Sequence, residues 1–199
     1  CKFSDRTFGT IETMRDIWEE QLQWLGSGEP FVLARVIRTW RSAPRKTGAG
    51  MLIGKGMRVA GSVSGGCIEG AVIEEALEVL ESGESRQLSY GVEDDLALSV
   101  GLSCGGEVSV LAEKHWAFSA DPQTKEVWNA LQNSIRNNCP AILISPLPSA
   151  GASSRGNQSE LLVLPGGENV GGFQENREEA VALAEEAYNG RENSIVEIA

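Results

Sequence analysis

The chain is poor in the residues that build most metal centres and disulfide frameworks. It has one histidine and four cysteines in 199 residues, and no two cysteines form a CxxC pair. A histidine-based metal centre, a zinc knuckle and a disulfide scaffold are therefore disfavoured. His115, which ends a strand beside Trp116, is not expected to be catalytic. The four cysteines are expected to be free thiols in a reducing compartment.

Long apolar runs are absent as well. No stretch approaches the roughly 18 apolar residues that a membrane span requires, and the first ten residues lack the pattern of a secretory signal. The formal net charge of −11 argues against nucleic acid and anionic membrane surfaces as partners, because both favour a basic excess. We therefore expect a cytoplasmic protein.

Acidic residues are missing from one long segment. Between Pro30 and Ile68 there is no Asp or Glu, but there are seven basic residues: Arg35, Arg38, Arg41, Arg45, Lys46, Lys55 and Arg58. Any one of them could simply pair with an acidic helix nearby, but seven together are harder to explain in that way. The basic loop "RSAPRKTGAGM", residues 41–51, suits phosphate recognition. It is not a P-loop, because no GK[ST] follows its glycines.

The two halves of the chain resemble each other at an offset of 110 residues. The offset brings Trp18 onto Trp128, Pro30 onto Pro140, Leu52 onto Leu162, Gly56 onto Gly166 and Gly61 onto Gly171. Each half predicts an amphipathic helix, three strands and a second helix. The expected fold class is α/β (α+β), with two similar helix–strand–strand–strand–helix halves related by an internal repeat. A mixed sheet flanked by helices is expected.

One domain is expected over residues 1–199. Copy one covers about 10–90, with helices near 11–25 and 68–80, strands at 30–37, 50–56 and 58–64, and a closing strand at 86–90. A segment that occurs once, about 91–117, should hold a short helix, a glycine turn and a strand at 107–112. Copy two covers about 120–199, with a helix capped by Asp121, strands at 140–147, 160–167 and 169–174, a helix at 177–190 and a closing strand at 193–198. Residues 146–160 should form a mobile loop.

Two cysteines lie beside glycine turns. The stretch "GSVSGGCIEGAV", residues 61–72, places Cys67 between a glycine pair and the first turn of a helix, and "GLSCGGEV" places Cys104 before Gly105 and Gly106. Glycines there let a ligand approach the backbone, and the first N–H groups of a helix favour an anion or a thiolate. The two thiols could face one pocket, or each could be a small buried hydrophobe. Cys139 is expected to be structural.

Three blocks resemble a known family. The stretches "RSAPRKTGAGMLI", "GSVSGGCIEGAV" and "YGVEDDLALSVGLSCGGEVSVLAE" are similar to signature blocks of the xanthine dehydrogenase accessory factor family, XdhC/CoxI, over residues 31–113. The resemblance implies a maturation factor that binds molybdenum cofactor (molybdopterin) transiently, assists its sulfuration and inserts it into a molybdenum hydroxylase such as xanthine dehydrogenase. It implies a cofactor chaperone more than a catalyst. Full-length members usually continue into a Rossmann-type domain, so a short member or a fragment is expected.

The resemblance also implies roles for particular residues. Arg45 and Lys46 would hold the cofactor phosphate, the glycine turns would admit the pterin, and Cys67 or Cys104 would contact molybdenum or carry sulfur. The expected cofactor-binding set is Arg45, Lys46, Ser64, Gly65, Gly66, Glu69, Gly105 and Gly106, with Cys67 and Cys104 as catalytic and metal-contacting residues.

Several partners and two other functions stay open at this point. Besides the hydroxylase, the expected partners are a cysteine desulfurase, a separate Rossmann-domain protein and a second copy of the chain in a homodimer. The first alternative function is a thiol redox protein in which Cys67 and Cys104 form a reversible disulfide. The second is a docking scaffold that binds no ligand.

Overall fold

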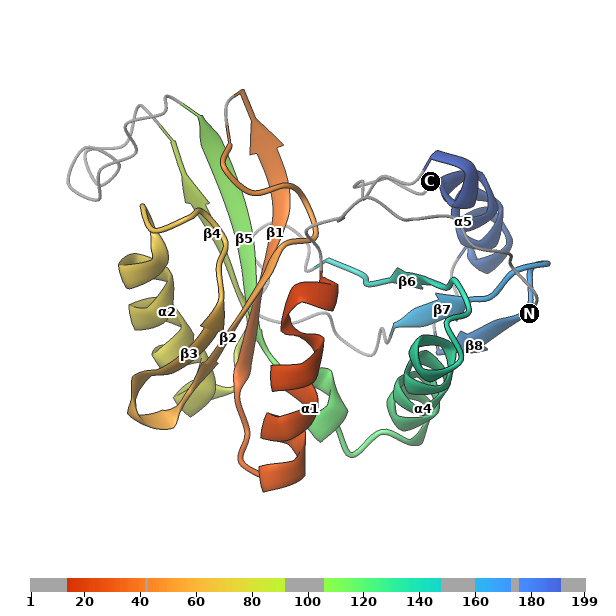
Figure 1. Ribbon diagram of the computed structural model, residues 1–199, viewed down its shortest axis with the longest axis horizontal. Coiled ribbons are helices and arrows are strands. Elements are labelled where there is room, and N and C mark those ends of the chain that lie inside the picture. The colour runs from red at the N-terminus through yellow and green to blue at the C-terminus, as the bar shows by residue number, and fades with distance from the viewer. Residues whose placement is uncertain (1–13, 42, 92–105, 148–159, 173–175, 191–199) are drawn as a thin grey trace. The chain divides into compact units, whose positions relative to one another are not determined.

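The chain folds into two compact units. A computed structural model describes residues 14–41, 43–91, 106–147, 160–172 and 176–190. The contacts of these residues form one unit up to His115 and a second unit from Trp116 onward. That the two units make up a single family domain stays a prediction. Each unit is a small sheet with helices, drawn in Figure 1. No helix among the described residues is long and apolar enough to cross a membrane.

The first unit is built on a five-stranded sheet. Its elements in chain order are the 3-10 helix η1 (Met14–Ile17), α1 (Trp18–Ser27), β1 (Val32–Trp40), β2 (Gly50–Gly54), the 3-10 helix η2 (Lys55–Met57), β3 (Arg58–Gly61), α2 (Glu69–Ser82), β4 (Arg86–Tyr90) and β5 (Glu107–Lys114). The strand order is β3-β2-β1-β5-β4, and every pair is antiparallel. Helices α2 and α1 lie on opposite faces of this sheet (Figure 1).

The core of the first unit lies between α2 and the sheet. Val72, Ala76 and Val79 recur at helical spacing and are fully buried against strand residues such as Met51 and Val110. Burial of each larger side chain contributes about 1.5–3 kcal/mol. The helix ends where Gly83 adopts a left-handed conformation, φ 80°, as its position in the sequence predicted.

The second unit is smaller. It contains the 3-10 helix η3 (Trp116–Phe118), α4 (Pro122–Arg136), β6 (Ile142–Ile144), β7 (Leu161–Val163), β8 (Asn169–Gly171) and α5 (Arg177–Gly190). Its three strands pair antiparallel in the order β6-β7-β8, and α4 and α5 lie on opposite faces of the sheet (Figure 1). The Asp121 carboxylate accepts the Thr124 N–H at 2.8 Å, so the predicted cap of α4 is confirmed. The predicted closing strand at 193–198 and most of the 146–160 loop lie outside the described residues.

The α/β fold class is confirmed, but the sheet differs from the expectation. The described strands form two antiparallel sheets instead of one mixed sheet. Short connections account for the antiparallel pairs β2–β3 and β7–β8, because adjacent strands joined by a tight turn run in opposite directions. At the predicted offset of 110 residues, the pair Leu33↔Leu52 corresponds to Leu143↔Leu162. That the units are copies of one ancestral unit stays a prediction.

Gly61 allows the closest backbone approach in the first sheet. It has φ +80°, and an added Cβ would lie 2.4 Å from the Gly50 carbonyl oxygen and 2.5 Å from Cγ2 of Ile17. A side chain there would push η1 and β2 away from β3. Gly70, in the first turn of α2, offers the contrast, because a Cβ there would meet nothing within 4 Å.

We predict that Gly61→Ala lowers the free energy of unfolding by more than about 2 kcal/mol, because it adds both a clash and a strained φ. Gly70→Ala should leave stability unchanged or raise it by up to about 1 kcal/mol, because alanine favours a helix. Urea titration of both variants checks this. Equal stability of the two variants would contradict the packing argument.

His115 is a buried structural residue of the first unit. It is 1% exposed, its N–H donates to the Phe31 carbonyl at 2.9 Å, and its ring lies 4.9 Å from the Phe31 ring. Burial, with a smaller contribution from the positive charge of Arg35, lowers the pKa of His115 to about 3. The ring is therefore neutral at physiological pH, in keeping with a packing role.

A buried neutral histidine makes stability depend on pH. Because the folded pKa of about 3 lies below the ordinary value of 6.5, the unfolded chain takes up the proton first as the pH falls. We predict that, below pH 6.5, wild type loses roughly 1 kcal/mol of stability per pH unit more than His115→Phe does. Urea unfolding at pH 7.5, 5.5 and 4.5 measures both slopes. Parallel slopes would show that His115 is not held neutral.

Candidate functional site

The loop before α2 folds around the carboxylate of Glu69. Oε1 accepts the Ser62 hydroxyl at 2.6 Å and the N–H groups of Val63, Ser64 and Gly65 at 3.2, 2.9 and 3.1 Å. Oε2 accepts the Gly66 N–H at 2.8 Å and the Ser64 hydroxyl. The glycine-rich backbone was expected to let a ligand approach, and the start of the helix to favour an anion or a thiolate. In the structure this backbone surrounds a carboxylate of the same chain.

The glycines make this wrapping possible. Gly65 and Gly66 have φ values of +80° and +115°, which turn consecutive N–H groups toward one point. Glu69 is half-buried in the first turn of α2, where the helix dipole also favours a negative charge. Burial raises the pKa of Glu69, but the hydrogen bonds from Ser62 and Ser64 outweigh it and bring the pKa to about 2.

Ser64 connects the carboxylate to the start of the helix. Its buried hydroxyl donates to Glu69 and accepts the N–H groups of Cys67 and Ile68, each at 3.0 Å. Ser64 thereby satisfies N–H groups that the helix itself leaves without an acceptor. Ser64 and Glu69, both expected to bind the cofactor, thus make their observed hydrogen bonds within the loop.

Cys67 lies at the end of this loop as a half-buried free thiol. Its side chain packs against the core cluster of the first unit. Cys139, the matched free cysteine of the second unit, is also half-buried and follows α4, where its N–H donates to the Ser134 carbonyl at 2.8 Å. Cys104 and Gly105 lie outside the described residues, so the convergence of two thiols stays a prediction. Gly106 is buried just before β5.

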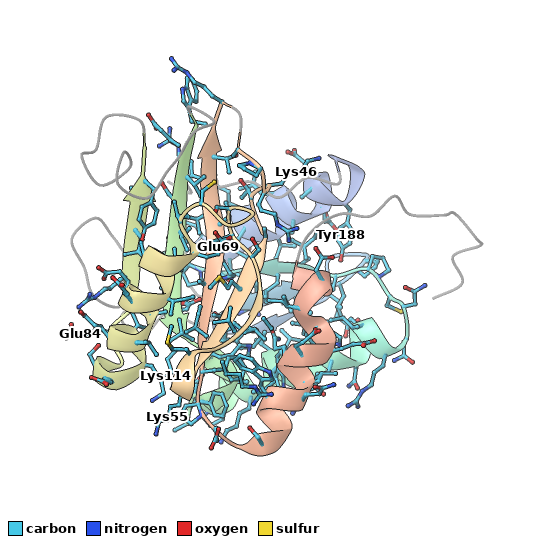
Figure 2. The ribbon with its side chains drawn as sticks, turned by 60° about the vertical axis from the view of Figure 1, so that its left-hand side comes forward. Lys46, Lys55, Glu69, Glu84, Lys114 and Tyr188 are labelled. Carbon is cyan, nitrogen blue, oxygen red and sulfur yellow. The ribbon has the colours of Figure 1, made fainter. Side chains whose placement is uncertain are left out.

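The basic loop lies beside the Cys67 loop. A Cβ added to Gly65 would be 3.6 Å from Cβ of Pro44, which places the two loops in contact. Arg45 pairs with Asp16 at 3.2 Å, whereas Lys46 is exposed. Figure 2 shows Lys46 and Lys55 toward opposite ends of the first unit, with Glu69 between them.

The seven basic residues of the acid-free segment do not form one patch. Three of them contact other side chains: Arg35 pairs with Glu113 at 2.5 Å, Arg45 pairs with Asp16, and Arg58 lies 4.1 Å from the centre of the Trp24 ring. The other four are exposed: Arg38, Arg41, Lys46 and Lys55. Pairing with acidic groups thus accounts for part of the segment, and Arg41 and Lys46 are exposed cations of the basic loop that touches the Cys67 loop.

Sequence reasoning missed the role of Glu69 as an acceptor for its own loop. The signal was present, because a glutamate in the first turn of a helix, preceded by serines and glycines, often accepts nearby backbone N–H groups. In the part of the chain that the structure describes, no three His, Cys, Asp or Glu side chains gather into a metal site. The arrangement can present one thiol and one ammonium group from adjoining loops.

Fold and site together define a two-unit α/β protein that holds a cysteine at the start of a helix beside a basic loop. Residues 24–91 of the chain match the model of the XdhC and CoxI family. This match confirms the resemblance found in the sequence. The matched range includes both the basic loop and the loop around Glu69.

Two curated relatives carry informative names. The molybdenum cofactor insertion chaperone PaoD of Escherichia coli is 36% identical over 100 residues, which are 50% of this chain and 31% of the relative. A Bacillus subtilis protein that is named as a probable subunit of xanthine dehydrogenase is 36% identical over 109 residues, 53% of this chain and 31% of that protein. The chain thus matches about a third of the length of each relative.

A solved structure has the same fold. A crystal structure described as a xanthine dehydrogenase from Bacillus halodurans matches with a TM-score of 0.61 and 24% identity. The match covers 78% of this chain and 44% of that one. This likeness extends the comparison beyond the range of the family model.

The low pKa of Glu69 predicts how stability responds to acid. A carboxylate with a folded pKa of about 2 adds stability that is fully present above its ordinary value of 4.5 and is lost as the pH falls toward 2. The stability difference between wild type and Glu69→Gln should therefore be constant from pH 7 to 5 and shrink by pH 3. Urea unfolding measures it, with Glu74→Gln on the exposed side of α2 as the control. A difference independent of pH would contradict the prediction.

Proposed function

We propose that this chain helps to mature a molybdenum hydroxylase by binding molybdenum cofactor and delivering it to the enzyme. The observation that carries the proposal is the family match over residues 24–91, which contains the Cys67 loop and the basic loop. The name of a relative that is 36% identical, a molybdenum cofactor insertion chaperone, supports the same role. The cofactor is the cargo of such a protein, and the chain itself need not catalyse a reaction.

The chemistry of the two loops suits such a cargo. The cofactor carries a phosphate, for which an exposed ammonium group such as that of Lys46 is a suitable partner. The guanidinium of Arg45, the preceding residue, is paired with Asp16, so a phosphate would share it with that carboxylate. The cofactor also carries an oxidised metal with sulfur ligands, for which the Cys67 thiol is a soft donor. Contact of Pro44 with Gly65 brings the two loops into reach of one small molecule.

The finer parts of the proposal concern transfer. Binding is transient, because a carrier must release its cargo to the hydroxylase. Cys104, Gly105 and Gly106 form a second thiol turn in the proposal, which completes the site with Cys67. Assistance in sulfuration, with a separate cysteine desulfurase as the sulfur source, and a cytoplasmic location belong to the same proposal.

We predict that wild-type protein retains molybdenum cofactor after anaerobic incubation and desalting. Oxidised pterin fluorescence and elemental molybdenum analysis measure the retained amount. Cys67→Ser and Lys46→Ala should each lower retention by about tenfold, because each removes a strong contact. Cys139→Ser and Lys55→Ala are the matched controls, since Cys139 lies in the other unit and Lys55 lies toward the other end of the first unit (Figure 2).

Two outcomes would overturn the proposal. Wild-type protein that retains neither pterin nor molybdenum would exclude a cofactor carrier and favour a docking scaffold. Protein that retains no cofactor but loses two thiols reversibly on oxidation would favour a thiol redox protein. Equal retention by Cys67→Ser, Lys46→Ala and the two controls would remove the assigned residues from the site.

A further inference from the structure

The loop between β3 and α2 has an unusual set of hydrogen bonds. Each of the seven backbone N–H groups of residues 62–68 has an acceptor. The N–H of Ser62 donates to the Gly50 carbonyl, four N–H groups donate to the Glu69 carboxylate, and those of Cys67 and Ile68 donate to the Ser64 hydroxyl. The N–H of Gly65 is shared with the Ser62 hydroxyl at 2.9 Å, and that hydroxyl itself donates to Glu69. Six of the seven N–H groups therefore depend on Glu69, either directly or through a serine hydroxyl.

The Ser64 hydroxyl has a defined orientation. A serine hydroxyl can donate one hydrogen bond and accept two. Its donor is used by Glu69, and its lone pairs accept the N–H groups of Cys67 and Ile68. The orientation of the N–H of Cys67 is thus fixed, through one intermediate oxygen, by the carboxylate two residues further along the chain.

Only a carboxylate fits this arrangement. Every group that faces the two Glu69 oxygens is a donor, either a backbone N–H or a serine hydroxyl. A glutamine in its place would turn two N–H donors toward the Gly66 N–H and the Ser64 hydroxyl, or toward the other donors if the amide were flipped. A loop with two glycines at positive φ also loses much entropy on ordering, so it needs such an anchor.

We propose that Glu69 is the positioning residue of Cys67: its carboxylate holds the 62–68 loop closed and sets the orientation and exposure of the thiol. The inference rests on the proposed function, because it explains how the carrier would hold the Cys67 thiol in position for its cargo. It also gives Glu69, which was expected to bind the cofactor, a role within its own loop. Loss of the carboxylate releases the loop and exposes the half-buried thiol.

Chemical rescue tests this role. The rate of Cys67 alkylation by iodoacetamide, followed by peptide mass spectrometry, should rise by about tenfold in Glu69→Ala, because several charge-assisted hydrogen bonds are lost. Acetate should lower the rate again by filling the vacated place of the carboxylate, whereas chloride at equal ionic strength should not. Alkylation of Cys139 in the same samples is the internal control, and Glu74→Ala on the same helix is the matched variant.

Two further variants separate positioning from a loss of folding. Glu69→Gln keeps the shape and loses the acceptor, so it should raise Cys67 alkylation with little response to acetate. Ser64→Ala keeps the carboxylate but removes the hydroxyl that links it to the N–H groups of Cys67 and Ile68. It should also raise the rate of Cys67 alkylation, and acetate should not lower that rate. Simultaneous acceleration at Cys139 would indicate general unfolding and would overturn the proposal, as would a wild-type rate at Cys67 in all three variants.

The measurement is independent of the cofactor. Unchanged Cys67 alkylation in the Glu69 variants, together with cofactor retention that depends on Cys67, would overturn the positioning role and leave the carrier function standing. If acetate suppresses the faster Cys67 alkylation of Glu69→Ala, but the wild-type protein retains no cofactor, the positioning role stands and the carrier function is overturned.

Discussion

The carboxylate of Glu69 is the interaction on which the candidate site depends. A loop without regular structure leaves its backbone donors in need of acceptors, and here one side chain collects four of them. Because the same carboxylate orients the hydroxyl of Ser64, the ordering extends to the first residues of α2. The position of Cys67 is therefore a property of the loop as a whole.

Packing on both sides determines where this loop begins and ends. At its start, β3 lies so close to β2 that only glycine fits at position 61, and the N–H of Ser62 still donates to the Gly50 carbonyl at 3.1 Å. At its end, Ile68 and Val72 are fully buried in the core under the sheet. Between these anchored ends, Val63 is also buried in the core, and the Glu69 carboxylate accepts the N–H groups of residues 63–66.

The elements were predictable because their signals are local. The cap at Asp121, the stop at Gly83 and the bounds of α5 follow from short patterns, and the structure confirms each. Strand direction was not predictable in the same way. The strand β5 pairs with β1 although more than 60 residues separate them, and no local pattern announces such a partner.

The sequence was enough to identify the two loops of the candidate site, but not the contacts that their residues make. The Cys67 loop and the basic loop were recognised from glycines and charge, and the structure brings them together at Pro44 and Gly65. Their hydrogen bonds were not predictable, because a donor-rich loop looks the same in sequence whether it binds an external anion or a carboxylate of its own chain. Arg45 likewise finds its partner Asp16 29 residues away.

The second unit has a different side chain at the position that corresponds to Cys67. At the predicted offset, Arg177 takes the place of Cys67, and its guanidinium donates to the side chain of Asn169 at 2.7 Å and to the Gly171 carbonyl at 2.9 Å. The second unit thus has at this position a guanidinium that donates hydrogen bonds, where the first unit has a thiol. Gly171 is as crowded as Gly61, since a Cβ would lie 2.1 Å from the Glu160 carbonyl oxygen. A close strand approach therefore occurs in both units, whereas the carboxylate-held thiol lies in the first unit.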